Sequence, residues 1–179
     1  MQTQNTNLGL SGKFIFSDCG LVINPTEDNL VEIVLESYDS FKKLLNEEPK
    51  IALLSYSTLD DIKDENVIKL QNVVRRVKEI NNNINIDGQL QLDAAIIPEV
   101  AEFKAKGSPL KGEANVLVFP DLGAGNIGYK LTQRLAKAEA YGPLCQGIAR
   151  PVNDLSRGCS SEDVAGVVAI TAVQAQSQG

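Results

Sequence analysis

Two short, continuously apolar runs constrain the fold of this chain most strongly. Residues 51–56 read IALLSY and residues 115–119 read NVLVF, and polar or turn-forming residues border each run. Strands that are buried on both faces have this pattern, because helices cover a parallel sheet on either side. Segments with helical spacing separate and follow the two runs. The sequence therefore predicts an α/β fold with a mostly parallel sheet, right-handed crossovers and helices on both faces, in three layers.

Weaker patterns predict the remaining elements. Strands are expected at residues 13–18, 84–86 and 144–148, and Asp87-Gly88 is expected to close the second of them. A first helix is predicted after the break at Asn24-Pro25-Thr26, with apolar residues at helical spacing up to residue 45. Further helices are predicted over about residues 67–80, 93–103, 127–140 and 162–174. These elements form one α/β domain over residues 11–150, behind a disordered or irregular lead at residues 1–10.

Composition excludes several classes of function. The chain has 179 residues, a net charge of −6 and no histidine. The acidic balance argues against a nucleic-acid partner or an anionic membrane surface, and no apolar run is long enough to span a bilayer. Cys19, Cys145 and Cys159 have no metal-ligand spacing, so we expect no metal site, and free thiols in a reducing cytoplasm. An anionic substrate must be held by local lysines, arginines and helix termini.

A polar run before the last predicted helix carries the residues with the most chemistry. Residues 151–160 read PVNDLSRGCS, and Asp163 follows in the first turn of the helix. A helix N-terminus favours anions, and the Arg157 guanidinium matches a phosphate or a carboxylate. Ser156 adds a hydroxyl, and the Asp163 carboxylate can take a proton from a nucleophile beside the anion. The alternative is structural, because residues 160–163 (SSED) are also a capping signature.

Three hydroxyl-bearing residues are candidates for substrate contact. Ser55, Ser57 and Thr58 follow a predicted buried strand. They therefore lie at the edge where open α/β sheets bind ligands, and their hydroxyls can donate to phosphate oxygens. They can equally cap the helix that follows.

A glycine-bearing segment supplies a second group of candidates. Residues 123–128 (GAGNIG) match the dinucleotide pattern G-x-G-x-x-G, but the acidic residue expected at the end of the next strand is displaced into a loop. A nicotinamide site is therefore a lesser alternative to a tight turn that lets the backbone approach a ligand or another segment. Asn126, Tyr129 and Lys130 belong to this region, and Lys130 with Arg134 forms either a ligand contact or a solvated basic edge.

Taken together, these segments resemble the phosphate acetyltransferase (phosphotransacetylase) family. The resemblance covers nearly the whole chain after the first dozen residues, and several long motifs occur in the family's order. They are residues 52–58 (ALLSYST), 87–96 (DGQLQLDAAI), 119–122 (FPDL), 125–130 (GNIGYK) and 151–158 (PVNDLSRG). The resemblance implies reversible acetyl transfer between coenzyme A and phosphate, with acetyl-CoA as a substrate and without a covalently bound cofactor.

The resemblance also implies roles for individual residues. Arg157 matches the arginine that binds the phosphate of acetyl phosphate, and Ser156 matches a serine that helps to stabilise the transition state. Asp163 matches the aspartate proposed to take the proton of the CoA thiol. We expect additional substrate contacts from the two groups of candidates described above: Ser55, Ser57, Thr58, Asn126, Tyr129 and Lys130.

The chain departs from the family at its beginning. Family members have two α/β domains with the active site between them and form homodimers, and the resemblance leads us to expect that the N-terminal of these two domains is missing here. We therefore expect residues 151–179 to be an active-site loop and a C-terminal helix that belong with the missing N-terminal domain. The alternatives are a non-catalytic dimerisation or ligand-binding module derived from the family, or, less favoured, a phosphate butyryltransferase.

Overall fold

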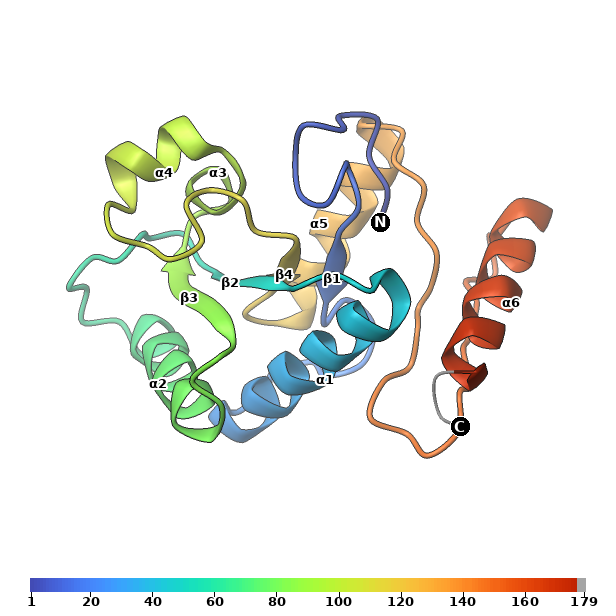
Figure 1. The fold of residues 1–179 in the computed structure, drawn as a ribbon, viewed down its shortest axis with the longest axis horizontal. Coiled ribbons are helices and arrows are strands. Elements are labelled where there is room, and N and C mark those ends of the chain that lie inside the picture. Colours follow the sequence, from blue (N-terminus) through green and yellow to red (C-terminus); the bar gives the residue numbers. More distant parts are fainter. Residues whose placement is uncertain (177–179) are drawn as a thin grey trace.

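The computed structural model describes residues 1–176 and contains a four-stranded sheet flanked by helices (Figure 1). The strands are β1 (Ile15–Ser17), β2 (Lys50–Leu54), β3 (Asn85–Leu90) and β4 (Val116–Val118). Their order across the sheet is β1-β4-β2-β3, and each neighbouring pair is parallel. This arrangement confirms the predicted α/β class with a parallel sheet.

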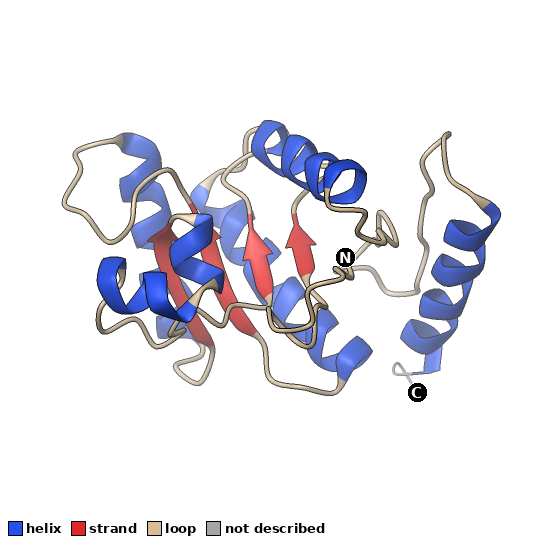
Figure 2. Cartoon of the chain, turned by 90° about the horizontal axis from the view of Figure 1, so that it is seen from above, coloured by secondary structure: helices blue, strands red, loops and turns tan. Residues whose placement is uncertain are grey.

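Helices cover both faces of the sheet, as Figures 1 and 2 show. On one face lie α1 (Glu27–Leu45) and α2 (Glu65–Ile80). On the other lie the short helices α3 (Leu92–Ile96) and α4 (Pro98–Lys104), and α5 (Leu122–Leu135) packs beside them against Phe119 through Gly128. The last helix, α6 (Ser161–Gln176), lies at the rim of the molecule beyond a long connecting segment.

Alternation along the strands divides the core in two. In β2, Ile51 and Leu53 join the apolar cluster under α1 and α2, whereas Ala52 and Leu54 join the cluster on the opposite face. Successive side chains of a strand point to opposite faces, so an uninterrupted apolar run supplies both clusters. Ile51 pairs with both Ile86 and Val116, which places the centre of β2 between its two neighbours.

The predicted break before the first helix is its N-cap. The Thr26 hydroxyl accepts a hydrogen bond from Asn29 N, and the Asn29 side chain accepts one from Thr26 N in return. This reciprocal pair satisfies two backbone donors that the helix itself leaves free. Arg76 of α2 then contacts Asp28 in the first turn of α1 at 2.6 Å, so the two helices also pair by charge.

Three predicted boundaries were wrong. The strand predicted at residues 84–86 continues through Gly88 to Leu90, because a glycine there lets the backbone pass close to Leu53 of β2. The helix predicted at residues 93–103 is divided at Ile97, whose extended backbone is the conformation favoured before a proline. The helix predicted from residue 127 begins at Leu122, since Asp121 caps it by accepting a hydrogen bond from Ala124 N at 2.8 Å.

The strand predicted at residues 144–148 was also wrong. Only Leu144 makes a bridge, which is isolated and antiparallel, with Asn153. The Gln146 side chain instead enters the body of the protein, where its Nε2 donates to the hydroxyls of Ser37 at 3.1 Å and Ser17 at 3.3 Å. The segment is held by this polar contact and not by a ladder of backbone hydrogen bonds.

The first residues follow an irregular path across the sheet. Gln2 pairs with Glu139 through two backbone hydrogen bonds of 2.9 Å, and Phe14 lies in the core. Met1 and Leu8 pack against the same apolar cluster as Phe14. Of the predicted C-terminal segment 151–179, residues 177–179 lie outside the described part of the chain.

Candidate functional site

The topology has a switch point at the carboxyl edge of the sheet, between β2 and β4. After β2 the chain crosses to α2 on one face, and after β4 it crosses to α5 on the other. Neighbouring strands whose connections leave in opposite directions open a crevice, where ligands of open α/β sheets bind. Residues 55–58 and 119–121 border this edge, and residues 55–58 follow a buried strand as predicted.

The three hydroxyl candidates after β2 differ in what they contact. Thr58 Oγ1 accepts a hydrogen bond from Gln91 N at 3.0 Å and lies 3.3 Å from Gln91 Oε1, so Thr58 ties its loop to the end of β3. Ser55 Oγ accepts a long hydrogen bond from Ser57 N at 3.4 Å. Ser57 is 3% exposed, and its Oγ has no hydrogen-bond partner among the described residues. Ser57 is therefore the one of the three whose hydroxyl is uncommitted.

Sequence reasoning missed a polar cluster that extends this edge. Lys104 Nζ of α4 donates to Gln91 Oε1 at 3.3 Å and to Asp93 Oδ2 at 2.8 Å. The Lys104 hydrogen bond lowers the pKa of Asp93 below its ordinary value. In the sequence, Lys104 and Lys106 form only a small basic cluster, and the contact of Lys104 with Gln91 depends on how α4 folds back.

The glycine-bearing segment is a helix and not a tight turn. A Cβ at Gly125 would collide with the carbonyl oxygen of Asp18, so the glycine allows the loop after β1 to pack on α5. Asn126 Nδ2 donates to Cys19 O at 3.3 Å and strengthens the same contact. Lys130 is exposed, with its Nζ 5.7 Å from the centre of the Tyr129 ring. Gly125 and Gly128 are thus explained by packing within the chain, against Asp18 and Phe119.

The motif before α6 is accessible to solvent. Ser156 and Arg157 are exposed, and Arg157 forms no ion pair or hydrogen bond among the described residues. Ser156 Oγ accepts only a long hydrogen bond, 3.4 Å from Gly158 N. The Arg157 guanidinium and the Ser156 hydroxyl are both available to an incoming anion.

Asp163 performs the capping role that was predicted as the alternative. Its Oδ2 accepts a hydrogen bond from Ser160 N at 2.9 Å, and Asp163 N donates to Ser160 Oγ at 3.1 Å. The other carboxylate oxygen of Asp163 accepts no hydrogen bond from the described residues. A cap and a proton acceptor are therefore compatible in one side chain.

The candidates form two separate groups. Within residues 1–176, no hydrogen bond or ion pair joins residues 151–163 to residues 55–58 or 126–130. Figures 1 and 2 show why, because α6 and the segment before it lie beside the sheet and not over its carboxyl edge. Each group alone offers part of a binding site.

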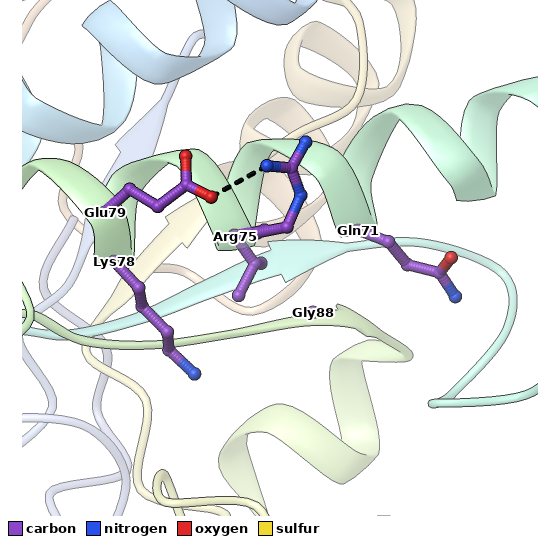
Figure 3. A pocket seen from close by; sticks show the side chains of 6 residues that line it. Gln71, Arg75, Lys78, Glu79 and Gly88 are labelled. Carbon is purple, nitrogen blue, oxygen red and sulfur yellow. Dashed lines mark hydrogen bonds and ion pairs between the residues drawn. The ribbon is translucent and has the colours of Figure 1, made fainter.

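A hollow of about 480 Å³ lies elsewhere, beside the outer strand β3 (Figure 3). Arg75, one of its two cationic residues, is paired with Glu79 of the same helix at 2.8 Å. The hollow contains none of the predicted site residues, since it is lined by Gln71, Val74, Arg75, Lys78, Glu79 and Gly88. We assign it no role in the chemistry.

The described residues contain neither a metal-ligand cluster nor a membrane-spanning helix. Residues 1–176 contain no cluster of three or more histidine, cysteine, aspartate or glutamate side chains that could hold a metal ion. In the same part of the chain, every helix is too short or too polar to cross a membrane.

The unpaired cysteines provide a local test of the structure. Burial, reinforced by the Asp18 charge, raises the pKa of the half-buried Cys19 thiol to about 12. At pH 8 only roughly one Cys19 thiol in ten thousand is ionised, and the thiolate is the reactive form. We expect a maleimide at pH 8 to label exposed Cys145 about a hundredfold faster than Cys19, as measured by peptide mass mapping. The Cys145→Ser variant should lose the fast labelling of the peptide that contains residue 145. Equal labelling rates of Cys19 and Cys145 would contradict the half-buried position of Cys19.

Comparison with known proteins gives a consistent result. A family model described as phosphate acetyl/butaryl transferase matches residues 1–172. The phosphate acetyltransferase of Acetivibrio thermocellus is 58% identical over 176 residues, which are 98% of this chain and 53% of that protein. That of Clostridium acetobutylicum is 56% identical over 168 residues, or 94% of this chain and 50% of the relative. The chain spans about half the length of these curated relatives.

Solved structures agree on the fold. A phosphotransacetylase from Streptococcus pyogenes, 43% identical, superposes with a TM-score of 0.88 over 98% of this chain and 52% of its own. A branched-chain phosphotransacylase from Enterococcus faecalis, 28% identical, gives a TM-score of 0.78 over 94% of this chain and 60% of its own.

Proposed function

The chain belongs to the phosphate acetyl/butaryl transferase family, and from this premise we propose that it is the part of a phosphate acetyltransferase that carries Ser156, Arg157 and Asp163. The reaction is acetyl-CoA plus phosphate giving acetyl phosphate plus CoA, and it runs in both directions. The observation that carries the proposal is the Arg157 guanidinium, exposed and unpaired among the described residues beside the start of α6. A planar cation next to a helix N-terminus is suited to bind a phosphate.

The proposed chemistry assigns each residue one task. In the direction of acetyl-CoA formation, the CoA sulfur attacks the acetyl carbonyl carbon, and the Asp163 carboxylate takes the thiol proton. A bond forms between the CoA sulfur and the acetyl carbon. The bond between the acetyl carbon and the bridging phosphate oxygen breaks, and the phosphate leaves with the bonding electrons. Arg157 and the Ser156 hydroxyl stabilise the charge on the departing phosphate.

We propose that Ser55, Ser57, Thr58, Asn126, Tyr129 and Lys130 contact the substrates from the other side of the site. The Ser57 hydroxyl, which follows the carboxyl end of β2 and has no partner among the described residues, supports this more strongly than the other candidates. Thr58 and Asn126 already make contacts within the chain, which favours an indirect role in shaping the site. Residues 151–179 are proposed to belong with an N-terminal domain outside these 179 residues. The chain spans about half of its relatives' length, which leaves room for such a domain.

We also propose a homodimer in the cytoplasm. Ile127, Leu131 and Leu135 follow one another at four-residue spacing on α5, and their side chains are 52–78% exposed. Such a stripe on a helix supports a contact with another subunit. Three free cysteines fit a reducing compartment.

Thioester absorbance tests the proposed activity. The protein to use is the 179-residue chain joined to the part of the Acetivibrio thermocellus relative that it does not match, referred to below as the joined protein. We expect it to consume acetyl-CoA only when phosphate is present, and to use butyryl-CoA more slowly. We expect the 179-residue chain alone to show little turnover, because an incomplete site loses orientation worth roughly 7–11 kcal/mol of the barrier. An inactive joined protein, with the intact relative active in the same assay, would favour the non-catalytic module.

A further inference from the structure

The helix that carries Asp163 is poorly held by apolar packing. Along α6 only Val167 is buried, whereas the side chains of Val164, Val168 and Val173 remain 40–62% exposed. Burial of apolar surface is the main favourable term in helix docking, and here little of it is available. Polar contacts therefore add an important share to the limited packing of α6 on α1.

Asn153 supplies two polar contacts to α6. Its Nδ2 donates to Thr171 Oγ1 at 2.8 Å and to Gln174 Oε1 at 2.7 Å, both on α6. Its Oδ1 accepts from the backbone N–H of Cys145 at 2.9 Å. The amide thus uses both donors and its acceptor to join α6 to the connecting segment.

The orientation of this amide is fixed by its partners. The backbone N–H of Cys145 can only donate, so it must face the Asn153 oxygen. Thr171 Oγ1 already donates its proton to Val167 O at 2.7 Å, so it can only accept from Asn153. An aspartate at position 153 would keep the shape and the bond to Cys145, but it would lose both donors to α6.

The other end of the contact is anchored in the body of the protein. Gln146, next to Cys145, donates to the hydroxyls of Ser17 in β1 and Ser37 in α1, which are both buried. Hydrogen bonds of Gln146 to Ser17 and Ser37, the peptide link to Cys145, and the hydrogen bonds of Asn153 therefore connect the sheet to α6. A second close approach lies one turn after Asp163, where a Cβ at Gly166 would collide with the Tyr141 ring.

We infer that Asn153 is a positioning residue, which holds α6 on the α/β body and thereby fixes the place of Ser156, Arg157 and Asp163. The significance for catalysis rests on the proposed function, but the mechanical role does not. The residue acts through Thr171 and Cys145 and does not itself touch a substrate.

Hydrogen exchange of the 179-residue chain tests the mechanical role. In Asn153→Asp we expect the amides of α6 to exchange about tenfold faster, because two hydrogen bonds are lost. The amides of β2 should be unchanged, as should both regions in the control Asn24→Asp, which makes the same replacement at an exposed site. Unchanged exchange in α6, or equal acceleration in β2, would overturn the inference.

A second pair of variants keeps the test decisive if Asn153→Asp fails to fold. Thr171→Val removes the acceptor and should also accelerate exchange in α6, whereas Thr171→Ser keeps the hydroxyl and should restore slow exchange. In the joined protein, Asn153→Asp should lower kcat by about tenfold or more, since small misplacements of catalytic groups are costly. Faster exchange with an unchanged kcat would reduce Asn153 to a structural role. If the unsubstituted joined protein is inactive, the proposed function fails, while the exchange data still decide whether Asn153 holds α6.

Discussion

Replacing Phe41 by alanine is expected to lower the free energy of unfolding by about 3–5 kcal/mol. The Phe41 ring is 0% exposed and packs in the apolar cluster between α1, α2 and the sheet. Alanine would remove the buried ring and leave a cavity that rigid neighbours such as Ile51 and Val116 cannot fill. Since domains are stable by only about 5–15 kcal/mol, this one change removes a large share of the total.

Phe103→Ala is the matched control for this experiment. Phe103 of α4 is 87% exposed, so the same replacement should change the free energy of unfolding by no more than about 0.5 kcal/mol. Urea denaturation of the three proteins measures the difference as a shift in midpoint at constant slope. Equal losses for the two variants would mean that α1 does not pack on the sheet as described.

The sequence was sufficient to predict the core because the core depends on periodicity. The runs at residues 51–56 and 115–119 became the two central strands, since only a sheet covered on both faces buries uninterrupted apolar residues. The long helices were equally predictable, because the stripe from Val67 to Val77 and the cap at Thr26 are local signals.

The errors occurred where a distant segment decides the local structure. Gly88 was expected to end a strand, but the neighbouring Leu53 makes a glycine necessary within it. Residues 144–148 have the composition of a strand, yet Gln146 finds its partners in Ser17 and Ser37, more than a hundred residues away. No pattern within a short window contains such information.

The candidate site also contains residues that local sequence predicts and residues that only the fold identifies. Ser156, Arg157 and Asp163 could be proposed from the sequence because they are close together along the chain and beside one helix start. Asn153 stood in the same motif without an assigned role, since its partners Cys145 and Thr171 are identified only by the fold. The separation of the motif from residues 55–58 was likewise invisible in the sequence.

The second large effect is an expected loss of kcat in the Asp163→Asn variant of the joined protein. Asparagine keeps the size of the side chain and can still accept the hydrogen bond from Ser160 N, so the cap is largely retained. It cannot take up the proton of a thiol at neutral pH. Loss of a general base typically costs about 10²–10⁴-fold in rate, and we expect kcat to fall within this range. Little change in the melting temperature should accompany it.

Glu162→Gln is the control for charge. Glu162 lies in the same first turn of α6, is exposed, and carries the same negative charge next to the helix N-terminus. Its replacement removes an equal favourable interaction with the helix dipole. A general loss of charge at the start of α6 would affect both variants alike, whereas loss of a proton acceptor affects only Asp163→Asn.

The most direct test of the central claim is therefore to measure kcat and melting temperature together for the joined protein, Asp163→Asn and Glu162→Gln. If residues 156–163 are a reaction site, Asp163→Asn loses turnover at nearly constant melting temperature, and Glu162→Gln keeps its turnover. If Asp163→Asn keeps its turnover but melts at a lower temperature, Asp163 is only a helix cap, and its proposed role as the base is wrong.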